Sequence, residues 1–176
     1  AETADARVCR GELYVALHRG TLTAQANTKR ANRRCEHLLR EADLWAATAA
    51  VRCGLPYPAD ELQRCWRTVL LQQFHDILPG SSIQWVHEQN EEDYAIALAE
   101  LERSITEALE AAGLSAAVVN SAEHARRSLA LDADGTPLAL VETPALGVAS
   151  LTPVAPAHPV RAERDGDDVV LENGLV

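Results

Sequence analysis

The chain is poor in aromatic residues and has no methionine. Among its 176 residues are one phenylalanine, three tyrosines and three tryptophans, so aromatic residues make up 4% of the sequence while hydrophobic residues make up 47%. Alanine and leucine must therefore fill the core, which favours closely packed helices over an aromatic-rich β-sandwich. Because the sequence starts at alanine and contains no methionine, we expect it to be a piece of a longer protein.

Long apolar runs and basic clusters are also missing. No apolar run approaches the roughly 18 residues that span a bilayer, so we expect no membrane partner. The net charge is −10, and a binder of nucleic acid needs a basic face for the phosphates, so we expect no nucleic-acid partner. The sequence is compatible with either a monomer or a homo-oligomer.

The sequence contains few cysteines, and their spacing matches no common metal-binding motif. The four cysteines form no Cys-x-x-Cys pair, which argues against a structural zinc knuckle. Four cysteines in a chain of this length do not make a disulfide scaffold either, so we predict a reducing compartment and a cytoplasmic location. Cys35 and Cys65 fall on helical faces, and we interpret both as small buried apolar residues.

Helical periodicity dominates the first two thirds of the chain. The spacing predicts helices over 23–112 in three segments, with breaks near 53–59 and 79–81. The first segment carries a regular apolar stripe. Its members are Leu38, Leu39, Ala42, Trp45, Ala46 and Ala49.

The second and third segments have similar stripes. On the second we assign Trp66 to the core, since its helical neighbours are apolar. These are the residues predicted for the inner sides of the two helices: Leu62, Trp66, Val69, Leu70 and Phe74, then Tyr94, Leu98, Leu101, Ile105, Leu109 and Ala112. The acidic residues between 88 and 110 show no pair of catalytic carboxylates and indicate a solvated face. Short connections between three such helices predict an antiparallel three-helix bundle.

Composition changes after residue 113. Short β-type runs near 116–120, 129–131, 138–141, 148–151 and 169–171 are separated by turns that contain glycine and proline. The mainly α bundle is therefore expected to be followed by the start of a β-sandwich domain. A further short strand is expected over 13–17. The expected boundaries are 1–20 for a strand and tail, 21–113 for the bundle and 114–176 for the partial β domain.

The stretch from 70 to 82 is the most informative part of the sequence. Pro79 and Gly80 end a helix there, and Ser81 is expected to cap the next one in a capping box with Gln84. His75 suits the negative end of a helix, whereas the carboxylate of Asp76 does not. A histidine near a helix end is more often a cap or a packed core residue than a ligand, so the pattern alone favours a structural role.

The motif Gln73-Phe74-His75-Asp76-Ile77-Leu78-Pro79-Gly80-Ser81-Ser82 resembles the signature of glycoside hydrolase family 38, the zinc-dependent α-mannosidases. The resemblance implies that His75 is a zinc ligand and that Asp76 binds the sugar.

A second patch over 11–33, which begins Gly11-Glu12-Leu13-Tyr14-Val15-Ala16-Leu17-His18-Arg19-Gly20-Thr21, is similar to the entry of the helical middle domain in that family. The resemblance makes His18 and Arg19 candidates for substrate binding.

The same resemblance implies what the chain lacks. Retaining glycosidases use two carboxyl groups about 5 Å apart. In this family both belong to an N-terminal α/β domain, which also supplies the other zinc ligands, and none of its motifs occurs here. We therefore expect a fragment of a zinc-dependent retaining α-mannosidase that is inactive by itself and that has no catalytic residue of its own. The alternative is a non-catalytic helical interaction module. An upstream α/β domain with a His-x-Asp motif would separate the two.

Overall fold

The computed structural model describes residues 8, 10, 11, 19–132 and 134–174. Three helices are followed by six strands: α1 (Ala26–Cys53), α2 (Ala59–Gln72), α3 (Gln84–Ala111), β1 (Ala117–Asn120), β2 (Arg126–Leu131), β3 (Pro137–Thr143), β4 (Gly147–Ser150), β5 (Arg161–Asp165) and β6 (Asp168–Glu172). The chain forms two compact units, Ala1–Ala108 and Leu109–Val176. The predicted boundaries at 20/21 and 113/114 stay predictions, and the strand predicted over 13–17 lies outside the described residues.

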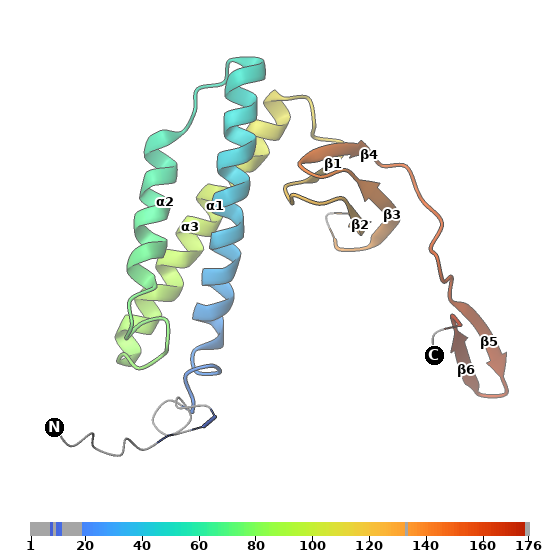
Figure 1. Cartoon of the computed structure of the whole chain (residues 1–176), viewed down its shortest axis with the longest axis horizontal. Helices are drawn as coiled ribbons and strands as arrows, with labels where there is room; N and C mark the ends of the chain where they lie inside the picture. The colour runs from blue at the N-terminus through green and yellow to red at the C-terminus, as the bar shows by residue number, and fades with distance from the viewer. Residues whose placement is uncertain (1–7, 9, 12–18, 133, 175–176) are drawn as a thin grey trace. The chain divides into compact units, whose positions relative to one another are not determined.

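The first unit contains α1, α2 and most of α3, and consecutive helices run in opposite directions (Figure 1). The α1 stripe predicted from the sequence is confirmed, since all six of its residues are buried. Gly54 ends α1 with φ of 72°, and its N–H bonds to the carbonyl oxygens of Ala49 and Ala50. Glycine adopts this left-handed conformation without the steric cost that a Cβ brings.

Aliphatic side chains and cysteines fill most of the core of the bundle. Cys35 and Cys65 are buried as predicted, and Trp45 and Tyr94 are the buried aromatic residues in the described part of the bundle. One connected cluster of buried side chains consists of Cys35, Leu38, Leu39, Ala42, Leu62, Cys65, Val69, Tyr94, Ala97 and Leu101. Leu98 and Ile105 pack against its side, so the centre of the α3 stripe runs through Ala97 and Ala108 rather than through these two residues.

The prediction for the outer part of α2 was wrong. Trp66, Leu70 and Phe74 were expected in the core, yet they are 44%, 60% and 49% exposed. The residues that α2 buries are Leu62, Cys65, Val69 and Gln72. The helix thus has two apolar faces, and only one of them faces α1 and α3.

The second unit contains the strands. β1 pairs with β4, β2 with β3 and β5 with β6, all antiparallel, and β3 also contacts β1 and β4. The five predicted β-type runs each lie in or next to a strand, and β5 and β6 form a hairpin whose turn contains Gly166. Each sheet has two strands, so the β-sandwich stays a prediction. Within the described ranges no helix is both long and apolar enough to cross a bilayer.

Candidate functional site at the end of the helical bundle

The predicted site lies on a series of turns and not on a helix. α2 ends at Gln72, and residues 73–80 form successive turns in which Ile77 N–H and Leu78 N–H both bond to the Phe74 carbonyl oxygen. The sequence prediction that the helix continues to Pro79 was therefore wrong. His75 and Asp76 lie beyond the last helical turn, so the argument from the helix dipole does not apply to them.

Ser81 and Ser82 close this loop instead of capping α3. The Ser82 hydroxyl donates to the Asp76 carbonyl oxygen at 2.7 Å, and the Ser81 hydroxyl lies 3.4 Å from Asp76 Oδ1. α3 begins only at Gln84, whose side chain bonds to Glu88. The predicted capping box is thus absent: both serine hydroxyls donate to the Asp76 carbonyl oxygen, and that of Ser81 also lies near the Asp76 carboxylate.

His75 presents an exposed ring beside a carboxylate. Its side chain is 78% exposed, and Nε2 lies 3.4 Å from Asp76 Oδ2. The Phe74 ring is its other neighbour, with centroids 4.2 Å apart and a tilt of 49°. A carboxylate at this distance can fix the tautomer of a histidine that binds a metal through its other nitrogen.

A polar layer inside the bundle holds the chain just before this turn. The Thr28 hydroxyl donates to Asn90 Oδ1 at 2.8 Å, Asn90 Nδ2 donates to Gln72 Oε1 at 2.8 Å, and Gln72 Nε2 donates to Asp93 Oδ2 at 2.6 Å. Thr28, Gln72 and Asn90 are all buried. Each helix of the bundle therefore contributes to a hydrogen-bond chain that fixes the end of α2.

The next residue, Gln73, is anchored to α1. Its Nε2 donates to Asn32 Oδ1 at 2.9 Å and to Glu36 Oε1 at 3.0 Å, and Asn32 also accepts from the Tyr94 hydroxyl at 3.1 Å. Gln72 and Gln73 are thus both held by hydrogen bonds inside the bundle, and the exposed ring of His75 follows two residues later. Buried polar networks with every member paired specify one arrangement of the chain.

Sequence reasoning overlooked these polar residues, although a signal was present. Thr28 and Asn32 continue the α1 stripe toward its start through Cys35, at spacings of three and four residues, and Asn90 lies four residues before Tyr94, where the α3 stripe begins. A polar residue that continues an apolar stripe lies where side chains are buried, so it requires a buried partner.

The other two predicted site residues are His18 and Arg19. Arg19 lies in an exposed turn before α1, and His18 lies outside the described residues. No group of three or more histidine, cysteine, aspartate or glutamate side chains in the described part of the chain could hold a metal ion. Among the predicted residues that the structure describes, His75 and Asp76 lie next to each other, with Nε2 3.4 Å from Oδ2.

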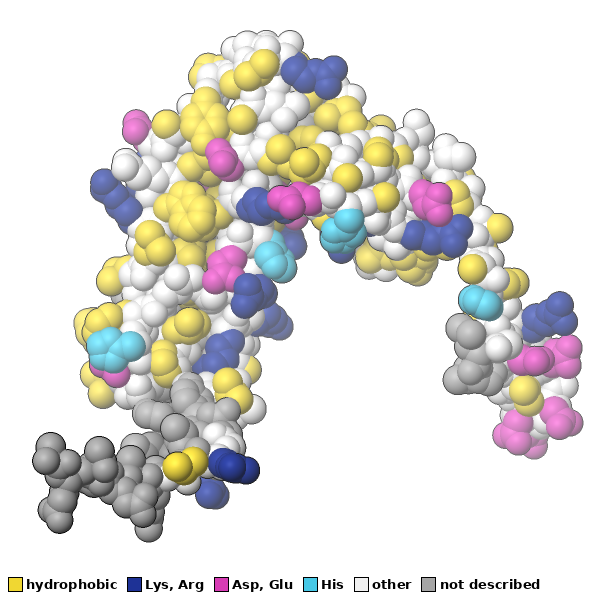
Figure 2. Space-filling view, in the orientation of Figure 1, with side chains coloured by type: hydrophobic (Ala, Val, Ile, Leu, Met, Phe, Trp, Pro, Cys, Tyr) yellow, Lys and Arg dark blue, Asp and Glu magenta, His cyan; other side chains and the backbone are white. Residues whose placement is uncertain are grey.

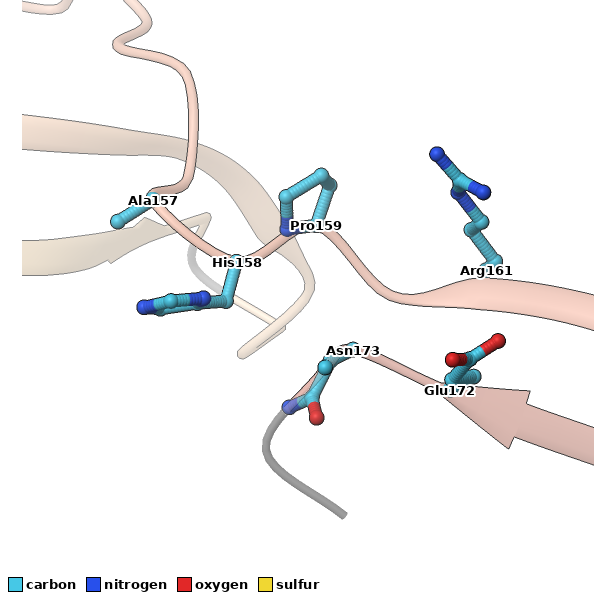
Figure 3. Close-up of a pocket in the computed structure, with 7 residues that line it drawn as sticks. Ala157, His158, Pro159, Arg161, Glu172 and Asn173 are labelled. Carbon is cyan, nitrogen blue, oxygen red and sulfur yellow. The ribbon is translucent and has the colours of Figure 1, made fainter.

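A separate cavity of about 240 Å³ lies beside the β5–β6 hairpin (Figure 3). It is lined by Ala157, His158, Pro159, Arg161, Glu172, Asn173 and Gly174. The ring of His158 and the guanidinium group of Arg161 point in different directions in Figure 3, so these side chains do not converge on one ligand.

Comparisons with known proteins agree with the motif. Residues 16–111 match the family model described as "Alpha mannosidase middle domain". The chain is 36% identical to human "Alpha-mannosidase 2C1" over 185 aligned residues, which cover 94% of this chain and 18% of that protein. It is 41% identical to "Alpha-mannosidase G" of Dictyostelium discoideum over 99 residues, covering 56% of this chain and 9% of that protein. The chain thus spans less than a fifth of the length of these relatives.

Proposed function

Because the chain belongs to the α-mannosidase middle-domain family, we propose that it is part of a retaining, zinc-dependent α-mannosidase that hydrolyses terminal α-mannosides. In this proposal the chain provides one zinc ligand and sugar contacts, and the catalytic carboxylates come from a separate N-terminal α/β domain. The isolated chain would therefore have no activity.

The placement of His75 is the observation that carries the proposal. Its ring is 78% exposed, so it adds little to the core of the bundle, yet the chain before it is held by buried hydrogen bonds. Imidazole nitrogen and carboxylate oxygen are both donors that zinc accepts in proteins. His75 fits the role of one ligand to zinc, and the other ligands would come from outside the described residues.

Asp76 is proposed to bind the sugar. A carboxylate accepts strong hydrogen bonds from hydroxyl groups, and Ser81 and Ser82 hold this residue in place. Zinc held by His75 and by ligands of the N-terminal domain would supply a Lewis acid beside the sugar that Asp76 binds. Arg19 and His18 stay proposed substrate contacts.

Exposed apolar side chains support a domain partner at this end of the bundle. Leu70, Leu71 and Phe74 lead into the turn, and Ile83 and Trp85 follow it, with exposed fractions from 49% to 69%. Figure 2 shows hydrophobic side chains on the surface of the helical unit. Large exposed apolar patches mark interaction sites in soluble proteins. We propose that the N-terminal α/β domain covers these residues in the parent protein; the cytoplasmic location and a homo-oligomer stay predictions.

The test is His75→Ala in the full-length parent, with zinc content and hydrolysis of an aryl α-mannoside as readouts. We expect loss of stoichiometric zinc and of turnover, while the helical circular dichroism signal stays unchanged. His37→Ala is the matched control, since His37 is also exposed but lies on α1. If the His75 variant keeps its zinc and normal turnover, the ligand role is wrong and His75 has a structural role only.

A further inference from the structure

The only lysine of the chain lies at the contact between two turns. Among 16 basic residues Lys29 alone is not arginine. Its Nζ donates to the carbonyl oxygens of Ala24 at 2.5 Å, Leu78 at 2.9 Å and Pro79 at 3.5 Å. Ala24 precedes α1, whereas Leu78 and Pro79 follow His75 and Asp76. One ammonium group therefore joins the segment before α1 to the predicted site.

The chemistry of this contact suits lysine and not arginine. An ammonium group carries three donors on one atom, arranged as a tetrahedron, and here three carbonyl oxygens surround that atom. A guanidinium group has its donors in a planar fork, which matches carboxylates better than a cluster of carbonyl oxygens. Lys29 is half-buried, and the carbonyl dipoles replace part of the water that its charge loses.

The same two segments also touch through their backbones. Gly80 has φ of 89°, and a Cβ added there would lie 2.9 Å from Ala24 Cβ and 3.1 Å from Gln25 Cγ. Gln25, the residue before α1, has a positive φ of 51°. Glycine thus allows the turn to approach the start of α1 closely, and Lys29 spans the contact.

We infer that Lys29 is a positioning residue, which holds the His75–Asp76 turn against the segment before α1 and so sets where the zinc ligand and the sugar contact lie. The inference rests on the proposed function, because only that function gives the turn a metal and a substrate. Lys29 itself would touch neither of them.

The experiment compares three variants of the full-length parent: Lys29→Met, Lys29→Arg and, as a matched control, Arg30→Met. Arg30 is the next residue of α1 and is exposed, so its replacement removes the same charge without touching the turn. The readouts are hydrogen exchange in peptides covering 74–82 and in peptides from the helices, zinc retention against a chelator, and kcat and KM with an aryl α-mannoside.

In the Lys29→Met variant we expect exchange over 74–82 to accelerate at least about tenfold, while exchange in the helices stays unchanged. Zinc should be lost at lower chelator concentrations, and kcat/KM should fall by about 10- to 100-fold, as expected when a reacting group is displaced by about 1 Å. Lys29→Arg should give smaller changes in the same direction, and Arg30→Met should match the wild type.

Two results would overturn the inference. One is unchanged exchange over 74–82 in Lys29→Met. The other is faster exchange throughout the helices together with a lower melting temperature, which would show that Lys29 stabilises the whole bundle and not the turn in particular. If Lys29→Met does not fold, the same comparison of exchange over 74–82 and in the helices is made with Lys29→Arg. A wild-type parent without zinc or mannosidase activity would instead refute the proposed function, and the exchange data would still show whether Lys29 holds the turn.

Discussion

The hydrogen bond between Thr28 and Asn90 allows a direct test of the polar layer that fixes the end of α2. Both side chains are fully buried, and the Thr28 hydroxyl donates to Asn90 Oδ1 at 2.8 Å. Thr28→Val removes the donor and leaves a buried amide oxygen without its partner, which costs about 1–2 kcal/mol. Asn90→Leu is close in volume but leaves two groups unpaired, the Thr28 hydroxyl and Gln72 Oε1, so it should cost roughly 2–4 kcal/mol.

The double variant is the informative measurement. Once Asn90 is leucine, Thr28→Val removes a buried hydroxyl that has no partner, so it should recover about 1–2 kcal/mol of stability. The double variant should therefore be more stable than Asn90→Leu alone, with a coupling energy of roughly 2–4 kcal/mol between the two positions. The free energies of unfolding come from urea denaturation of the 176-residue chain, followed by circular dichroism at 222 nm.

Thr106→Val is the control for this cycle. Thr106 is an exposed residue of α3 whose hydroxyl bonds to the Glu102 carbonyl oxygen within the same helix. Its replacement should change the free energy of unfolding by less than about 0.5 kcal/mol. Strictly additive effects of Thr28→Val and Asn90→Leu would show that the two side chains are not hydrogen-bonded, and the reasoning about the polar layer would then be refuted.

Four further predictions follow from the same structure. Asp76→Asn in the parent should keep zinc and lower kcat/KM by about one to two orders of magnitude, roughly 1.4–3 kcal/mol, as measured by metal analysis and steady-state kinetics. Burial raises the pKa of Cys35 to about 11, and burial together with the Glu100 carboxylate raises the pKa of Cys65 to about 12. Above pH 9.0, the ordinary pKa of a cysteine thiol, these thiols lose protons in the unfolded state but stay neutral in the folded state. The melting temperature should therefore fall as the pH rises above about 9, and it should fall less in the Cys35→Ala variant. Gly80→Ala should lower the free energy of unfolding by about 1–2 kcal/mol, since it places a Cβ at positive φ, and equal stability would contradict the close contact. The purified chain should not hydrolyse an aryl α-mannoside, and turnover proportional to its concentration would disprove this.

Periodicity was sufficient to locate the helices because their buried residues are mostly apolar. The stripe of α1 follows from spacing alone, and Gly54 and Gly113 mark helix ends because both adopt positive φ. Five of the six strands were found for a similar reason, since turns with glycine or proline separate short β-type runs, whereas no run was predicted over β5. These features depend on residues close together in sequence, which is why a single sequence reveals them.

The end of α2 could not be predicted in this way. Leu70, Phe74 and Ile77 have helical spacing, yet the helix stops at Gln72. The side chain of Gln73 bonds to residues more than 30 positions earlier, and such distant partners leave no mark on the local pattern. Ser81 looked like a helix cap as well, but its hydroxyl lies 3.4 Å from Asp76 Oδ1, only five residues earlier in the chain.

The two apolar faces of α2 explain why the exposed residues were assigned to the core. Periodicity shows that Trp66 and Leu70 share a face with other apolar residues, but it does not show what covers that face. The chain spans less than a fifth of the length of its relatives, so a face of α2 can be apolar because it contacts a part of the protein outside these 176 residues. The polar layer then has a consequence for the proposed site: the turn is fixed from inside the bundle, while its exposed side remains available to a partner domain. A histidine that must meet ligands from another domain requires this arrangement, because its position has to be set before those ligands arrive.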